Sequence, residues 1–232
     1  LGYWLEQQGV QRGSQPWYYY ILITIPIYEF LPALACLLAA YFSLRKPTTP
    51  VNQIAEIDQA YDSRTNLVSL LGWWTVTSIA AFTFAGEKMP WLTFHMALPM
   101  VLWGGWAIGT LIDRIDWQEL RRRNALLVLA LLAIFTLSVV GIFIALLGSP
   151  RPFEGQELAQ LQATTSFIFA IVGAFASLFG LYRLLSDWDY KQALYLNTLV
   201  FFGILAVLTA RATIRANYIT YNSAVEYLVY AH

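Results

Sequence analysis

The sequence predicts an all-α, polytopic integral membrane protein with about six transmembrane helices. Its residues are 58% hydrophobic and only 12% charged, whereas a soluble domain usually carries about 25% charged residues. Six segments stay apolar over roughly the 20 residues that a helix needs to cross the hydrocarbon core. They show no strict two-residue alternation, which argues against a barrel of strands. We expect the spans at 17–43, 66–86, 90–112, 124–148, 163–186 and 193–211.

The spans define one expected transmembrane helical domain over 1–211, with the start of an extracytoplasmic tail over 212–232. The chain opens at Leu1 and ends in "NSAVEYLVYAH", so we expect it to be the C-terminal part of a longer polypeptide. The longest linker, 45–66, contains "IAEIDQAY", which is expected to form amphipathic turns at the membrane surface. "GWAIG" at 105–109 is a pattern that lets another helix approach closely.

The basic residues predict the orientation, because cytoplasmic loops are enriched in Lys and Arg. If the loop after the first helix is cytoplasmic, that side receives nine of the 14 Lys and Arg residues, including "RRR" at 121–123. Both termini then lie outside. The outer face would carry "RGSQPWYYY", "GEKMPW", "SPRPFEGQE" and "RATIRANY". Any chemistry is therefore expected on the outer face.

Charge, cysteine and histidine content exclude several classes of function. The formal net charge is zero, so nucleic acid, which needs a basic face, is not an expected partner. The single cysteine, Cys36, excludes an internal disulfide. His95 and His232 lie far apart and make no metal-site spacing. No cofactor is expected, although a divalent metal remains possible.

The segment "QPWYYY" at 15–20 begins the first span. Trp and Tyr favour the headgroup level, so one interpretation is an aromatic belt. In the other interpretation, Trp17 and Tyr18 line a groove for a sugar or an isoprenoid chain, which Gln15 and Arg12 would help to orient.

Glu29 is expected about twelve residues into the first span, near the bilayer midplane, between Pro26 and Pro32. Helical spacing places it on the face of Tyr18, Leu22, Ile25 and Pro32. An ionisable residue at that depth is a functional candidate. The alternative, which we favour, is a structural hydrogen bond to a neighbouring helix.

Two further sets of residues are candidates for contact with a lipid phosphate. In "GEKMPWLTFHMALP" (86–99), Lys88 stands at the membrane edge, where it could snorkel or contact a phosphate. Trp91 and His95 share a helix face at i, i+4. Arg211 and Arg215 have the same spacing where the last span ends, and could bind a phosphate or anchor anionic headgroups.

These motifs, in this order, resemble GT-C membrane glycosyltransferases related to protein O-mannosyltransferases and aminoarabinose transferases. The similarity is greatest to the archaeal and bacterial branch described as flippase-activity-associated proteins, which implies a prokaryotic plasma membrane. It rests on "RGSQPWYYYILITIPIYEFLPAL", "GEKMPWLTFHMALPMVLWGG" and "NYITYNSAVEYLVYAH".

The resemblance implies transfer of a sugar from a polyprenyl-phosphate donor at the outer face of the membrane. Lys88 and Arg12 would then bind the donor phosphate, and Trp17, Tyr18 and Trp91 would line the groove, to which we add Gln15 and His95. Arg211 and Arg215 are added from their spacing. The catalytic acid of this superfamily lies in a first outer loop that nothing here matches. The catalytic residue is therefore unknown, and this chain alone is not expected to catalyse transfer.

Two other functions remain open. The chain could be a structural helical subunit of a larger membrane complex, with the other subunits as partners. It could also be part of a lipid flippase or transporter, with a continuous groove lined by Glu29. The partners expected in the enzyme interpretation are the lipid bilayer and a polyprenyl-phosphate sugar.

Overall fold

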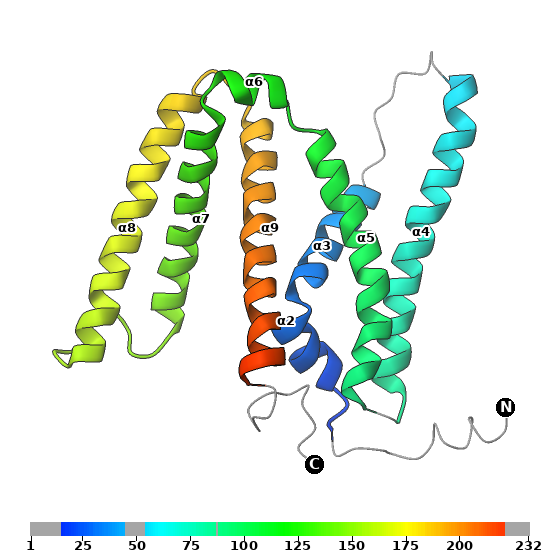
Figure 1. The fold of residues 1–232 in the computed structure, drawn as a ribbon, viewed down its shortest axis with the longest axis horizontal. Helices are drawn as coiled ribbons and strands as arrows, with labels where there is room; N and C mark the ends of the chain where they lie inside the picture. Colours follow the sequence, from blue (N-terminus) through cyan, green and yellow to red (C-terminus); the bar gives the residue numbers. More distant parts are fainter. Residues whose placement is uncertain (1–14, 45–53, 87, 221–232) are drawn as a thin grey trace. The chain divides into compact units, whose positions relative to one another are not determined.

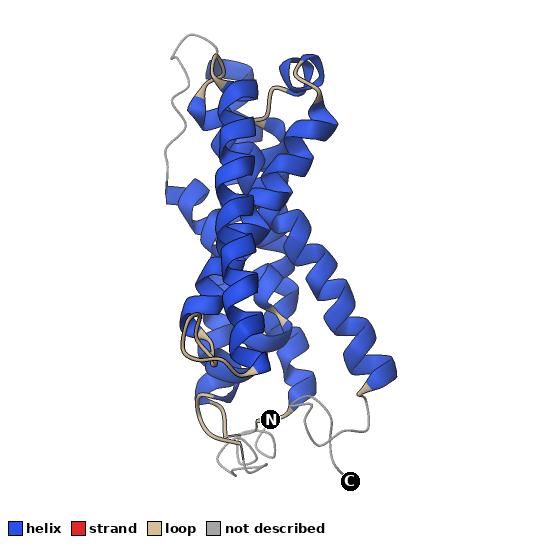
Figure 2. Ribbon diagram, turned by 90° about the vertical axis from the view of Figure 1, so that its left-hand side faces the viewer, coloured by secondary structure: helices blue, strands red, loops and turns tan. Residues whose placement is uncertain are grey.

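The computed structural model describes residues 15–44, 54–86 and 88–220, with the side chains of 54–65 left out. Within these ranges the secondary structure is entirely helical, without a strand (Figure 2). Five helices are long and apolar enough to cross a membrane, and a bent pair raises the number to six. The predicted all-α membrane fold is confirmed. The five are Asn66–Phe84, Pro90–Asp113, Ala125–Leu147, Leu158–Leu185 and Tyr190–Ile219.

The first expected span is broken at Glu29. A π-helix, η1 (Tyr19–Thr24), leads into the single turn of α2 (Ile25–Tyr28), and α3 (Phe30–Leu44) follows at 102° to them. Pro26 and Pro32 stand on either side of the break, and proline removes backbone donors that a continuous helix needs. The assumption of one straight helix is therefore wrong, while the expected midplane depth of Glu29 stays a prediction.

The next helices also differ from the predicted boundaries. Helix α4 (Ile54–Phe84) is continuous over 31 residues, so "IAEIDQAY" forms its first turns rather than separate ones. A 3-10 turn, η3 (Pro90–Leu92), opens α5 (Thr93–Asp113). At the other end of the chain, α9 (Tyr190–Ile214) continues into η4 (Arg215–Ile219), past the expected boundary at 211.

The chain divides into two compact units. Unit 1 comprises residues 1–110 and 205–232, and unit 2 comprises residues 111–204. In unit 1, buried Tyr19, Tyr20 and Met96 form one cluster, and Ile25, Cys36 and Met100 form another. Both clusters join η1, α2 or α3 to α5. The short helices before α4 are therefore held by apolar contacts with α5.

Helices α3 and α5 approach closely at Gly104. A Cβ placed on Gly104 would lie 2.6 Å from Cβ of Ala35, well inside van der Waals contact. A Cβ on Gly105 or Gly109 would meet no heavy atom within 4 Å in the described part of the chain. The close approach of helices therefore occurs one residue before the "GWAIG" pattern that was expected to provide it.

Unit 2 is built on a hairpin of α7 (Ala125–Leu147) and α8 (Leu158–Leu185), which Figure 1 shows side by side. The short α6 (Trp117–Arg122) precedes the hairpin. Glu157 and Gln160 form a capping box that starts α8, because each side chain bonds the other residue's backbone N–H. The apolar core of unit 2 contains Ile115, Leu120, Val128, Leu132, Leu181 and Leu196.

Candidate functional site

The two aromatic motifs singled out in the sequence meet in unit 1. The Tyr20 hydroxyl donates a hydrogen bond to the carbonyl oxygen of Met89 (3.0 Å) and accepts one from the Met89 N–H (2.9 Å). The same carbonyl accepts the N–H of Leu92, which starts the turn before α5. We call this contact the Tyr20–Met89 junction. It joins "QPWYYY" to "GEKMPW" at the turn between α4 and α5.

The aromatic residues of "QPWYYY" divide into a buried pair and an exposed pair. Tyr19 and Tyr20 are fully buried against Met96, whereas Trp17 is 70% and Tyr18 37% exposed. The exposed rings contact each other edge to face, with centroids 5.8 Å apart. Trp17 and Tyr18 are therefore available to a ligand or to lipid, and their role in lining a groove stays a prediction. Tyr20, which makes the junction, was not among the predicted site residues.

Lys88 is buried at the junction, and its ammonium group lies against the end of α4. Nζ donates to the carbonyl oxygens of Phe82 (3.2 Å), Thr83 (2.8 Å) and Ala85. Burial lowers the pKa of Lys88 from its ordinary value, while the carbonyl oxygens favour the protonated form. The ammonium group thus satisfies carbonyls that the helix end leaves without partners.

Lys88 also contacts the aromatic side of the junction, since Nζ lies 5.9 Å from the centroid of the Tyr20 ring. An ammonium has three N–H donors, and three carbonyl oxygens contact this one. A donor phosphate could bind Lys88 only by displacing some of these bonds. The predicted phosphate contact of Lys88 stays a prediction, and the structure adds a second role as the cap of α4.

Trp91 and His95 lie just beyond the junction, Trp91 in the turn η3 and His95 in the first turn of α5. Trp91 is 58% exposed, and His95 is also exposed. The His95 ring stacks on Phe82 of α4, with centroids 5.6 Å apart and planes 13° from parallel. Both side chains can therefore meet a lipid or ligand, while the His95 ring is positioned by α4.

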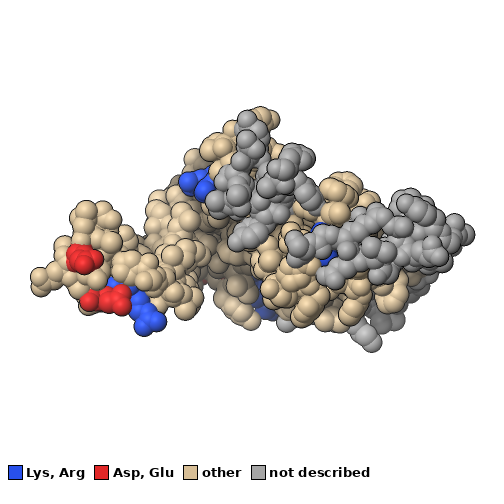
Figure 3. Space-filling model, turned by 90° about the horizontal axis from the view of Figure 1, so that it is seen from below, with Lys and Arg blue, Asp and Glu red and all other residues tan. Residues whose placement is uncertain are grey.

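Fewer contacts define the positions of the other predicted site residues. Gln15 is partly exposed at the start of the described chain, and Arg12 lies outside the described residues. Arg211 on α9 and Arg215 at the start of η4 are exposed. No hydrogen bond or ion pair joins them to Lys88 among the residues described. Figure 3 shows a largely uncharged face with a few Lys, Arg, Asp and Glu side chains.

Glu29 is partly buried at the break before α3. Its backbone N–H donates to Ile25 (2.9 Å), and its carbonyl accepts from Ala33 (3.0 Å), so the residue ends α2 and begins α3. Its hydrogen bonds to described residues are made by the backbone. Tyr18 and Leu22 are exposed while Ile25 is buried, so the expected common face does not form. The π-helical turn changes the angular spacing that the expectation assumed.

Two threonines beside the junction were not predicted as site residues. Thr83 and Thr93 are 6% and 4% exposed, and neither hydroxyl oxygen has a hydrogen-bond partner among the described residues. Buried polar groups are usually paired, so each hydroxyl lacks the hydrogen bond that a buried polar group normally makes. No sequence pattern distinguishes them from the other threonines of the spans.

A metal site is not formed by the part of the chain that the structure describes, where no group of three His, Cys, Asp or Glu side chains could hold an ion. No family model matches this chain, and neither a curated protein nor a solved structure matches it.

Proposed function

We propose that this chain is the transmembrane part of a glycosyltransferase-like protein that binds a polyprenyl-phosphate-linked sugar beside the Tyr20–Met89 junction. The supporting observation is the junction itself, where the two motifs that resemble GT-C enzymes come together across 69 residues. Exposed Trp17, Tyr18 and Trp91 provide aromatic surface for an isoprenoid or a sugar face. The unpaired hydroxyls of Thr83 and Thr93 provide polar atoms nearby.

A photoreactive polyprenyl-phosphate sugar tests this proposal on the full protein in vesicles. Crosslinks mapped by peptide mass spectrometry should concentrate in 15–22 and 86–95, and unlabelled polyprenyl phosphate should compete for them. Trp91→Ala should reduce crosslinking severalfold, whereas Trp73→Ala should not, although Trp73 is similarly exposed at 68%. Crosslinks spread evenly over the apolar helices, or insensitive to the competitor, would contradict the proposal.

The Lys88 contacts favour a second candidate function, a structural helical subunit of a larger membrane complex. A lysine whose donors are taken by carbonyl oxygens stabilises the protein without needing a substrate. Native mass spectrometry from the protein's own membrane separates the two functions. Stoichiometric partner subunits without any bound lipid phosphate would favour the structural role.

We also propose that the connectors around α6 face the cytoplasm of a prokaryotic cell, with the loop 148–157 outside. The connectors 114–124 and 183–191 carry six Lys and Arg residues, and the loop carries only Arg151, as the positive-inside rule requires. A membrane-impermeant maleimide applied to intact cells should label Ser149→Cys and not Gln118→Cys. Cys36 is buried and should contribute little labelling. The opposite pattern would reverse the orientation.

A further inference from the structure

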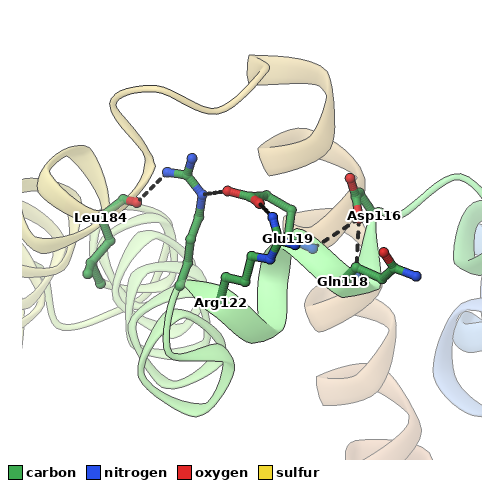
Figure 4. A network of polar contacts seen from close by, with 6 residues as sticks. Asp116, Gln118, Glu119, Arg122 and Leu184 are labelled. Atoms are coloured by element: carbon green, nitrogen blue, oxygen red, sulfur yellow. Dashed lines mark hydrogen bonds and ion pairs between the residues drawn. The ribbon is translucent and has the colours of Figure 1, made fainter.

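The connectors at the α6 end of unit 2 are tied into one surface. Arg123, after α6, donates from Nε to Glu119 (2.7 Å) and from a terminal nitrogen to the carbonyl oxygen of Leu184 on α8 (3.0 Å). Its guanidinium lies 6.0 Å from the Trp188 ring. Figure 4 shows this guanidinium group between Glu119 of α6 and Leu184 of α8. One arginine of "RRR" therefore fixes the connectors to each other.

Gln192 adds the start of α9 to the same surface. Its side-chain oxygen accepts the N–H of Asp116 (2.9 Å), and its side-chain nitrogen donates to the carbonyl oxygen of Arg114 (3.0 Å). The connectors before α6 and before α9 are thus joined directly. Charged residues that are distant in sequence are brought to one end of unit 2.

Three of the five acidic residues at this end of unit 2 are used by the protein itself, and the other two, Asp113 and Asp187, are exposed. Asp116 accepts the N–H groups of Gln118 and Glu119 and caps α6. Asp189 accepts the N–H of Lys191. Glu119 pairs with Arg123. These carboxylates are held by backbone or by a partly buried arginine, so they are poorly placed to neutralise the outward-facing arginines.

Arg121 and Arg122 are held much less tightly. Arg121 is exposed, and the Arg122 side chain is 79% exposed with one contact of 3.8 Å to Glu119. An exposed ion pair of that length contributes little. Both guanidinium groups are therefore available to an anion presented at the membrane surface.

Aromatic side chains indicate the level in the bilayer at which this surface lies. Trp117 on α6 is 39% exposed and donates its indole N–H to the carbonyl oxygen of Ile112. Tyr182 and Tyr190 are more than 70% exposed. Trp and Tyr prefer the headgroup level of a bilayer, so Arg121 and Arg122 stand where lipid phosphates lie.

We infer that this end of unit 2 binds anionic phospholipid headgroups through Arg121 and Arg122. A guanidinium group can form two parallel hydrogen bonds to the phosphate group of a phospholipid. An anionic headgroup also supplies negative charge, whereas Asp116, Glu119 and Asp189 are already bonded within the protein. The site lies in unit 2, so it is independent of the proposed sugar-lipid site in unit 1.

The test uses the full chain in phosphatidylcholine vesicles with trace spin-labelled phosphatidylglycerol or spin-labelled phosphatidylcholine. Electron paramagnetic resonance gives the association of each label with the protein, and their ratio is the selectivity. We expect the wild type to select phosphatidylglycerol severalfold, and salt to reduce this. Arg121→Gln with Arg122→Gln should bring the ratio to about one. A selectivity that persists in the double variant would overturn the inference.

Controls separate headgroup binding from loss of structure and from binding of free phosphate. Arg121→Lys with Arg122→Lys should retain part of the selectivity, because the charge stays while the bidentate fork is lost. Arg151→Gln, in the loop between α7 and α8, should retain all of it. Inorganic phosphate should reduce the selectivity no more than sodium chloride of equal ionic strength. An equal loss with Arg151→Gln, or specific displacement by inorganic phosphate, would contradict the inference.

Discussion

The Tyr20 hydroxyl holds both polar groups of the Met89 backbone, accepting from its N–H and donating to its carbonyl oxygen, across 69 residues of sequence. Tyr20 is completely buried, so water cannot easily replace these bonds. The contact fixes the turn between α4 and α5 to η1. Trp91, on this turn, and Trp17, just before η1, are held by the two elements that it joins.

Tyr20→Phe should destabilise the protein. The substitution keeps the ring but leaves the N–H and carbonyl of Met89 without the hydroxyl, at a cost of about 1–3 kcal/mol. Unfolding in detergent, followed by circular dichroism, measures the loss. Tyr18→Phe is the matched control, because Tyr18 is partly exposed and its change should stay within about 0.5 kcal/mol. Equal effects would show that the junction does not carry this stability.

Lys88→Met should also lower the free energy of unfolding, by about 1–3 kcal/mol. The apolar side chain can fill similar space but cannot donate to the last carbonyl oxygens of α4. Lys191→Met, at an exposed position, should have little effect in the same unfolding assay. If Lys88→Met is as stable as the wild type but loses binding of a polyprenyl phosphate, the phosphate role is the main one.

Gly104→Ala should destabilise the protein, whereas Gly105→Ala should not. The added methyl at 104 would meet Ala35 at 2.6 Å, and such overpacking costs about 1–3 kcal/mol. At 105 no heavy atom of the described residues lies within 4 Å, so alanine should be neutral or stabilise the helix by up to about 1 kcal/mol. The unfolding midpoints of the two variants in detergent test this. A destabilising Gly105→Ala would show that another helix packs on that face.

Glu29→Gln should change stability by less than about 1 kcal/mol. Glutamine has nearly the same shape, and the bonds of Glu29 to described residues are made by its backbone. The unfolding free energy and, for the full protein, sugar-transfer activity are to be measured together. A stable variant that loses most activity would make the Glu29 carboxylate functional rather than structural.

The sequence predicted the apolar helices well, because their hydropathy depends only on local composition. It predicted one straight first span, although Pro26 and Pro32 are the kind of residues that break helices. It also selected Tyr18 rather than Tyr20 as a site residue. Which tyrosine is buried depends on the π-helical turn of η1, and regular helical spacing cannot anticipate that turn.

Lys88 shows a different limit of sequence-based prediction. The sequence indicates snorkelling or phosphate contact for Lys88. Its position four residues after Phe84, the last residue of α4, also suits a lysine that caps a helix end. The boundary of α4 had to be known first. Thr83 and Thr93 could not be found at all, since an unpaired hydroxyl is a property of three-dimensional packing.

The sharp turn before α3 has a consequence for the surrounding lipid. Fifteen residues of α3 rise about 22 Å, while a typical hydrocarbon core is about 30 Å thick. The preceding segment turns away by 102° and adds little depth. If α3 crosses the bilayer alone, lipid beside it must compress or polar groups must reach inward, and such hydrophobic mismatch favours thinner regions of a membrane.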